Sequence, residues 1–221
     1  MIETSNLTME ASEVVSLFPT YVWCTQLKQQ DYEVINEKIK NKLTELTAGN
    51  PKLKPGEKWQ TEQELHTLKE FKELTAFIHA SAQAVLDYMK IAYDNFEITG
   101  CWANISAIDA QHVAHFHPNN YLSGVYYVQT QEGADTITFL DPRLQAHLIA
   151  PQTTEETPAN TGKMRLRVRD GSLVIFPAWL THAVDPNMSD KERVSVSFNI
   201  MFSSFSETIA KPIWDGNLKT K

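Results

Sequence analysis

The sequence contains little cysteine and no long apolar run. Its 221 residues include two cysteines, Cys24 and Cys101. Two cysteines provide neither a disulfide framework nor a cysteine-based metal site, so we expect a protein of a reducing compartment, the cytoplasm. No apolar stretch approaches the roughly 18–20 residues of a membrane-spanning helix, and the first residues lack the basic start and apolar centre of a secretory signal. These absences predict a protein that is not bound to a membrane.

Positive charge is also scarce. Lysine and arginine number 20 against 27 aspartates and glutamates, which gives a formal net charge of −7 at pH 7. General nucleic-acid binders usually carry a basic excess, so nucleic acid is not an expected partner. An apolar share of 42% and a charged share of 21% are ordinary for a globular protein. The length predicts a single domain over residues 1–221, and a homo-oligomer is compatible with the sequence.

The pattern of apolar residues changes near residue 96. Before it, apolar side chains recur at helical spacing and predict one helix near 31–49 and a longer one near 68–93. A short strand is expected within residues 14–27, entered at a proline. Residues 1–95 would form a helical support, and residues 207–221 a C-terminal tail.

Short β-rich runs separated by turn residues predict a β core over residues 96–206. The runs cover residues 96–107, 122–129, 136–140, 146–150, 163–169, 172–176 and 193–202. Strands of this number and spacing are typical of a sandwich or barrel. We therefore predict a mainly β fold of the α+β class, with the N-terminal helices packed on its outside.

Three histidines could bind one metal ion. His115 and His117 are two residues apart, so on a strand they point to the same face. His182 follows an apolar strand that ends at Pro177, at a corner from which it can face the pair. Imidazole binds Fe, Zn, Cu or Ni, and three such ligands would leave positions open for substrate and O2. A surface cluster of histidines is the alternative.

Other nearby groups fit a ligand role less well. His112 lies three residues before His115 and would point off the opposite face of a regular strand, so we assign it to the surroundings of the site or to the surface. Four carboxylates could in principle replace a histidine, but none has the right spacing: Asp109, Asp135, Asp141 and Asp185.

Arg193 opens a strand in which polar and apolar residues alternate. The alternation places Arg193, Ser195 and Ser197 on one face and Val194 and Val196 on the other. A buried arginine needs an anionic partner, and a carboxylate fits the guanidinium in a bidentate manner. We expect Arg193 to bind a ligand carboxylate with help from the Ser195 hydroxyl; an arginine that faces solvent is the alternative.

Four basic residues form a stripe along one predicted strand, and a tryptophan precedes His182. The stripe alternates along one predicted strand, and we interpret it as a solvated strand face rather than a surface for an anionic substrate. We expect Trp179, three residues before His182, to line the site. The residues of the stripe are Lys163, Arg165, Arg167 and Arg169.

Taken in order, the motifs resemble the Fe(II)/2-oxoglutarate-dependent oxygenase superfamily. They are His115-x-His117, the run Leu-Ser-Gly-Val-Tyr-Tyr-Val at 122–128, the segment Phe-Pro-x-Trp-x-x-His that ends at His182, and Arg193-x-Ser195. The arrangement is most similar to an uncharacterised branch found in marine bacteria and their phages. The resemblance covers roughly residues 102–202.

The resemblance implies a fold, a reaction and roles for individual residues. The fold would be a double-stranded β-helix of the jelly-roll type. The protein would be a dioxygenase that uses Fe(II), 2-oxoglutarate and O2, hydroxylates a small-molecule or peptide substrate, and releases succinate and CO2. His115 and His182 correspond to metal ligands. Four further residues correspond to contacts with 2-oxoglutarate: Arg193 and Ser195 at the distal carboxylate, Tyr127 beside them, and Asn104 at the other end.

His117 departs from the superfamily pattern. Most members carry Asp or Glu two residues after the first histidine. A site of three histidines, His115, His117 and His182, would carry one negative charge less and leave the metal centre more positive.

A cupin-like metalloprotein that does not use 2-oxoglutarate is the alternative function. The segment from Gly171 to His182 is similar to the second cupin motif, but the glutamate expected four or five residues after His117 is absent. A cupin does not need the pair Arg193-x-Ser195, so this pair favours the oxygenase. A barrel that binds a ligand without turnover is a third alternative.

Overall fold

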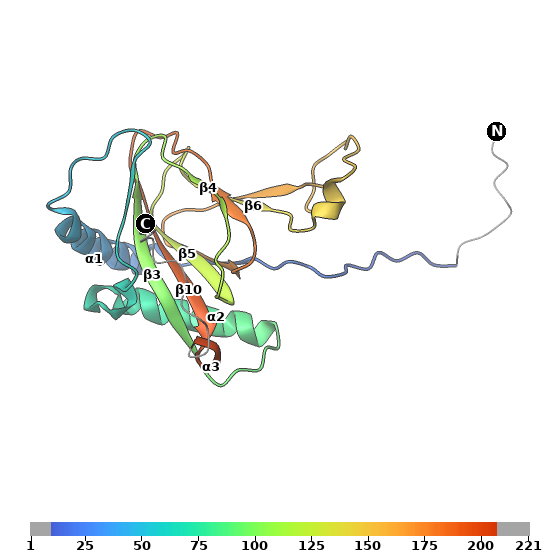
Figure 1. Ribbon diagram of the computed structural model, residues 1–221, viewed down its shortest axis with the longest axis horizontal. Coiled ribbons are helices and arrows are strands. Elements are labelled where there is room, and N and C mark those ends of the chain that lie inside the picture. The colour runs from blue at the N-terminus through green and yellow to red at the C-terminus, as the bar shows by residue number, and fades with distance from the viewer. Residues whose placement is uncertain (1–9, 207–221) are drawn as a thin grey trace, which may run out of the picture.

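Two antiparallel sheets face each other, and helices cover the outer face of the larger one (Figure 1). The structure, a computed structural model, describes residues 10–206; the predicted tail at 207–221 lies outside them. The six strands of the larger sheet are, in spatial order, β1 (Trp23–Gln26), β8 (Ser172–Pro177), β5 (Leu122–Gln129), β10 (Arg193–Phe202), β3 (Phe96–Ser106) and β2 (Lys58–Gln60). The four strands of the smaller sheet are β4 (His112–His115), β9 (His182–Val184), β6 (Thr136–Leu140) and β7 (Lys163–Arg167).

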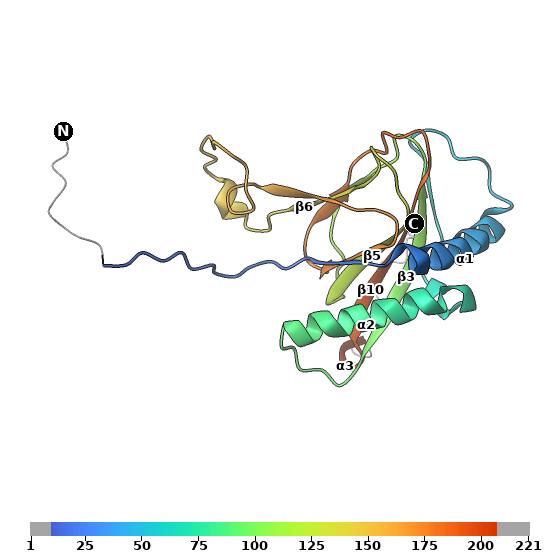
Figure 2. The same ribbon diagram turned by 180° about the vertical axis from the view of Figure 1, so that it is seen from behind.

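Two long helices, α1 (Gln29–Thr47) and α2 (Lys72–Tyr88), lie across the outer face of the large sheet (Figure 2). Each presents an apolar stripe to the sheet, with Ile39 and Leu43 buried on α1 and Ile78 on α2. The remaining helical pieces are short: 3₁₀ turns at Leu65–Thr67, Lys69–Phe71 and Leu144–His147, and α3 (Ser203–Ser206). The helices therefore close one side of the sheet and leave the other side to the site.

The large sheet separates two cores. One lies between the sheet and the helices and contains Val194, Val196 and Phe198 of β10. The other lies between the two sheets and contains Tyr127 of β5 and Phe139 of β6. The predicted alternation along β10 is thus confirmed, since its apolar residues face the helices and its polar residues face the smaller sheet.

A buried polar contact fixes α1 on the large sheet. Asn36 donates from its Nδ2 to the Val128 carbonyl oxygen at 2.9 Å, and its Oδ1 accepts from the Tyr126 hydroxyl at 2.8 Å. Both side chains are buried, and the contact satisfies their polar groups. The contact attaches α1 to β5, in which Tyr127, between Tyr126 and Val128, faces the site.

The strand predicted at residues 146–150 is wrong. The chain forms a 3₁₀ turn at Leu144–His147, and Leu148 and Ile149 are each 82% exposed. The apolar residues there have no neighbouring strand with which to pair, so they form no ladder. Conversely, β2 and β9 span three residues each, which is too few for a periodic pattern. They form because β2 pairs with β3 and β9 pairs with β4 and β6.

Among the residues that the structure describes, no helix combines the length and the apolar character that crossing a membrane requires.

Candidate metal and carboxylate site

The three predicted histidines lie together at one end of the smaller sheet. His115, the last residue of β4, is paired with His182, the first residue of β9, and their ring centroids are 4.4 Å apart. His117 follows just beyond β4, where its backbone N–H donates to the Ala178 carbonyl oxygen at 2.9 Å. One ring nitrogen from each of the three histidines lies within 4.8 Å of the others. This spacing can hold one metal ion.

Backbone carbonyls orient two of the three rings. His115 Nδ1 lies 2.7 Å from the Val113 carbonyl oxygen, and His182 Nδ1 lies 3.0 Å from that of Leu180. A carbonyl oxygen only accepts, so each Nδ1 carries the proton and donates. The opposite nitrogen, Nε2, is then left without a proton and available as a ligand, the arrangement common at metal-binding histidines.

Burial keeps the rings of His117 and His182 neutral. It is the main factor that lowers the pKa of His117 and that of His182, each to about 4, and repulsion from the neighbouring His115 adds to both shifts. A metal ion binds only the unprotonated imidazole. His117 and His182 are therefore in a binding-competent state at neutral pH.

Aromatic side chains surround the histidines. Phe176 of β8 lies 4.6 Å from His182 between ring centroids, and Trp102 of β3 lies 6.0 Å from His117. Trp179, expected at this position, is 54% exposed and instead lines a separate apolar pocket with Tyr21. Trp102 and Phe176 thus provide the apolar surroundings that we expected from Trp179.

The larger sheet presents a polar row to the same interior. Ser195 of β10 is paired with Asn104 of β3 on one side and with Tyr127 of β5 on the other. Directly paired residues share a face of the sheet, and Tyr127 packs in the core between the sheets. Arg193, two residues before Ser195 on β10, shares that face. The four predicted cosubstrate residues are therefore neighbours.

Several of these polar groups have no partner within the described part of the chain. The Tyr127 hydroxyl and the Asn104 Oδ1 are buried and make no hydrogen bond there, whereas Asn104 Nδ2 donates to Ser197 Oγ at 3.2 Å. Arg193 is 3% exposed, and within residues 10–206 its guanidinium makes no direct ion pair, although Asp185 is near enough to act on its charge. Burial lowers the pKa of Arg193, and attraction to the nearby Tyr127 and Asp185 opposes only part of this shift. An anionic ligand would therefore stabilise the buried charge further. This set fits an anionic ligand with polar oxygens.

Three of the four carboxylates named as substitute ligands have other partners. Arg167 Nη1 lies 2.7 Å from Asp135, Arg143 Nη2 lies 2.8 Å from Asp141, and Arg165 Nε lies 3.0 Å from Asp185. Asp109 sits in a turn at φ 62°. In the described residues only the three histidines group as metal ligands.

The basic stripe faces away from the site. Arg165 and Arg167 are paired with Thr138 and Thr136 on β6, whereas the intervening Leu166 packs in the core between the sheets. The arginines therefore lie on the outer face, where both form the ion pairs with Asp185 and Asp135. This placement agrees with a solvated strand face.

The structure places His112 differently from our expectation. His112 is paired with Val184 and His115 with His182, so three steps on β4 correspond to two on β9. The extra residue forms a bulge, which shifts the alternation by one position. His112 therefore lies on the same face as His115, toward the site. The regular alternation assumed from sequence does not hold here, and the local sequence contains no glycine to signal the bulge.

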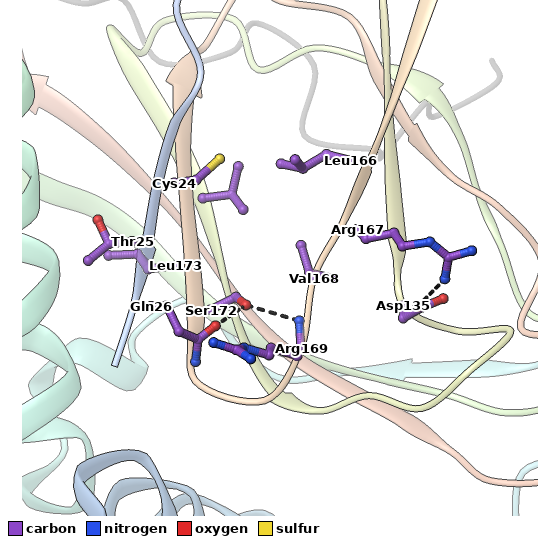
Figure 3. Close-up of a pocket in the computed structure, with 11 residues that line it drawn as sticks. Cys24, Thr25, Gln26, Asp135, Leu166, Arg167, Val168, Arg169, Ser172 and Leu173 are labelled. Atoms are coloured by element: carbon purple, nitrogen blue, oxygen red, sulfur yellow. Dashed lines mark hydrogen bonds and ion pairs between the residues drawn. The ribbon is translucent and has the colours of Figure 1, made fainter. Parts of the chain in front are cut away.

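A further pocket of about 360 Å³ opens between β1, β8 and β7 (Figure 3). Leu166 and Val168 point into it, while Arg167 turns toward Asp135. Ser172 Oγ donates to Gln26 Oε1 at 2.7 Å and accepts from the Arg169 N–H at 2.9 Å. These polar groups have partners within the protein, in contrast to the Tyr127 hydroxyl and Asn104 Oδ1 near Arg193.

Residues 100–199 match the model of a family described as "Putative 2OG-Fe(II) oxygenase". The matched segment, a little under half of the chain, contains all seven predicted site residues. No protein of curated function matches the sequence.

Several solved structures have the same fold. The α-ketoglutarate-dependent epimerase SnoN from nogalamycin biosynthesis has 12% identity and a TM-score of 0.59, over 89% of each chain. HygX from Streptomyces hygroscopicus, with nickel and 2-oxoglutarate bound, has 11% identity and a TM-score of 0.59, over 83% of each chain. A prolyl-4-hydroxylase from Pseudomonas putida has 13% identity and a TM-score of 0.56, over 83% of this chain and 93% of the other.

At these identities the structural likeness concerns the fold, and the family model adds a sequence match over the site. Fe(II) and 2-oxoglutarate, the predicted cofactor and cosubstrate, are those in the name of the matched family, and the three histidines supply a place for the metal. The marine and phage branch stays a prediction. The sequence match and the shared fold together support the Fe(II)/2-oxoglutarate-dependent oxygenase superfamily.

Proposed function

We propose that the protein is an Fe(II)/2-oxoglutarate-dependent dioxygenase that hydroxylates a small-molecule or peptide substrate. The observation that carries this proposal is the buried Arg193, which makes no direct ion pair within the described residues and lies on the face of the large sheet that is turned toward the smaller sheet with its histidine group. A metal site alone does not require a buried cation, whereas a dicarboxylate that binds the metal at one end needs a cation at the other. The double-stranded β-helix, formed by residues 96–206 of a single domain, belongs to the same proposal.

The metal would be held by His115, His117 and His182. All three ligands are neutral, so they offset none of the charge of Fe(II). Iron bound there supplies the activation of O2, with 2-oxoglutarate as the electron donor. The dianionic cosubstrate would then offset the positive charge of the metal that a carboxylate ligand offsets in other members of the superfamily.

The large sheet would hold 2-oxoglutarate. Arg193 donates two hydrogen bonds to the distal carboxylate, and the Ser195 hydroxyl adds a third. The Tyr127 hydroxyl, which has no partner within the described residues, donates to the same ligand. Asn104 lies on the other side of Ser195 and is oriented by its bond to Ser197. Each of these groups is nearly buried, which excludes water and strengthens the contacts.

The proposed reaction consumes one O2 and one 2-oxoglutarate for each substrate. One oxygen atom enters the hydroxyl group of the product, the other enters succinate, and CO2 leaves. The protein contributes orientation of the reactants and a buried, partly aromatic environment around the metal, to which Trp102 and Phe176 belong.

Anaerobic calorimetry tests this proposal with the redox-inert ion Mn(II) in place of iron. 2-Oxoglutarate should bind the Mn(II)-loaded protein in a ratio near one, and its affinity should fall sharply after the metal is removed. In air, the Fe(II) form should convert 2-oxoglutarate to succinate. Metal-loaded protein that does not bind 2-oxoglutarate would contradict the oxygenase and favour the cupin-like alternative.

A further inference from the structure

His112 faces the interior from the smaller sheet. Along β9, His182 and Val184 are two residues apart and share a face. Their partners on β4, His115 and His112, therefore share that face as well. His112 thus lies one cross-strand pair away from the His115–His182 pair, on the side of the molecule where residues 107–111 connect β4 to the end of β3.

Arg193 lies at that same end. It is paired with Ser106, the last residue of β3, and Ser106 is paired in turn with Lys58 of β2. The row Lys58–Ser106–Arg193 therefore stands on the interior face of the large sheet. Lys58 Nζ donates to the Gln111 carbonyl oxygen at 3.2 Å and lies 3.4 Å from His112 Nδ1. His112 is thus joined to the row that contains the carboxylate-binding arginine.

The contact with Lys58 determines which nitrogen of His112 carries the proton. An ammonium group only donates hydrogen bonds, so Nδ1 must accept. A neutral ring that accepts at Nδ1 carries its proton on Nε2 and can donate from there. After burial, Lys58 and Arg193 are the strongest influences that lower the pKa of His112, ahead of His115 and His182. The charges of Lys58 and Arg193 therefore act on the His112 ring more strongly than the rings of His115 and His182 do.

We propose that His112 is a second anchor for the cosubstrate: its Nε2–H donates to the carboxylate that Arg193 binds, and Lys58 is the positioning residue that fixes this tautomer. The carboxylate is then held from both sheets, by Arg193 and Ser195 of the larger and by His112 of the smaller. This inference rests on the proposed 2-oxoglutarate site. It assigns a function to the β4 bulge, which turns His112 inward.

Three substitutions of His112 distinguish a side chain that donates a hydrogen bond to the cosubstrate from one that only fills space. Gln places an amide nitrogen near the position of Nε2, Asn places one near Nδ1, and Phe keeps the ring without a donor. We expect His112→Phe and His112→Asn to weaken 2-oxoglutarate binding about tenfold or more, as for the loss of one hydrogen bond to a charged group. His112→Gln should stay within about threefold of the wild type. Calorimetry on the anaerobic Mn(II) form measures all four proteins.

Lys58 should act through His112. Lys58→Met removes the donor that fixes the tautomer of His112, and it should weaken 2-oxoglutarate binding less than His112→Phe does. Lys58→Arg keeps a cationic donor and should retain most of the wild-type affinity. In a His112→Phe background, Lys58→Met should have little additional effect, because its target is already absent. A full additional loss in the double variant would contradict the positioning role.

Controls distinguish failure of this inference from failure of the proposed function. His79→Phe changes an exposed histidine on α2 that stacks on Phe96 and should leave binding unchanged. Metal content should be unchanged in every His112 and Lys58 variant. Equal affinity for His112→Phe and the wild type, or equal losses for Gln and Phe, would overturn the anchor. Lack of 2-oxoglutarate binding by the wild type would overturn the proposed function and the anchor together.

Discussion

His115 and His182 are cross-strand partners on β4 and β9, and their ring centroids lie 4.4 Å apart. Each donates its Nδ1 proton to a backbone carbonyl oxygen two residues earlier in the chain, at Val113 and Leu180. The two rings are therefore oriented by the backbone of their own strands. Two ligands of the proposed metal site are in place before any ion binds, and His117 completes the set from the segment after β4.

Removal of either of these histidines should abolish metal binding. Purified protein loaded with Fe(II), Ni(II) or Zn(II) is expected to retain close to one ion per chain after desalting, whereas His115→Ala and His182→Ala should retain almost none. Loss of one of three ligands leaves an incomplete coordination set. Metal content by elemental analysis is the measurement, with His79→Ala as the matched control. Full occupancy in the His115→Ala, His182→Ala double variant would exclude this site.

His117→Asp should retain the metal, because a carboxylate is also a ligand for Fe(II). The added negative charge restores the pattern usual in the superfamily and should raise 2-oxoglutarate turnover, measured as succinate formed per unit time. His117→Ala, in contrast, should bind metal much more weakly. Metal affinity equal to that of the wild type in His117→Ala would place the third ligand elsewhere.

Arg193→Met should weaken 2-oxoglutarate binding and leave metal content intact. Removing one partner of a buried charged pair costs about 2–5 kcal/mol, which corresponds to roughly 30-fold to several thousandfold in affinity. We expect a loss of at least about tenfold by calorimetry on the anaerobic Mn(II) form. Arg167→Met is the matched control, because Arg167 lies on the outer face of the smaller sheet and pairs with Asp135. An unchanged affinity in Arg193→Met would move the carboxylate anchor to another residue.

Gly124→Ala should destabilise the protein through its core. A Cβ at Gly124 would clash with Phe198 Cζ and would lie 2.8 Å from the Val174 carbonyl oxygen. Such overpacking costs about 1–3 kcal/mol, and about 2–4 °C of melting temperature is lost per kcal/mol in a domain of this size. Differential scanning calorimetry should therefore show a decrease of about 2–12 °C. Gly49→Ala, whose Cβ would meet nothing within 4 Å, should change the melting temperature little; equal melting temperatures for both variants would contradict the packing argument.

The sequence by itself determined most of the β core and indicated the candidate site residues. The period-two pattern of β10 determined which residues face each side, and the strands β5, β6 and β10 have the predicted bounds. These features are local: alternation of polar and apolar residues along one strand is enough to assign faces. The same reasoning placed His115, Arg193 and Ser195 among the candidates, because each belongs to a short motif.

Only the tertiary structure decided how those motifs meet and which residues join them. The pairing of His115 with His182 depends on the register of β4 and β9, and no single strand contains that information. The β4 bulge turned His112 toward the site, although regular alternation predicts the opposite face. Lys58 contacts His112 from β2, a three-residue strand that forms because it pairs with β3. A hydrogen-bonded ladder is a property of two segments together, so register, bulges and cross-sheet neighbours follow from the packed chain rather than from the local sequence.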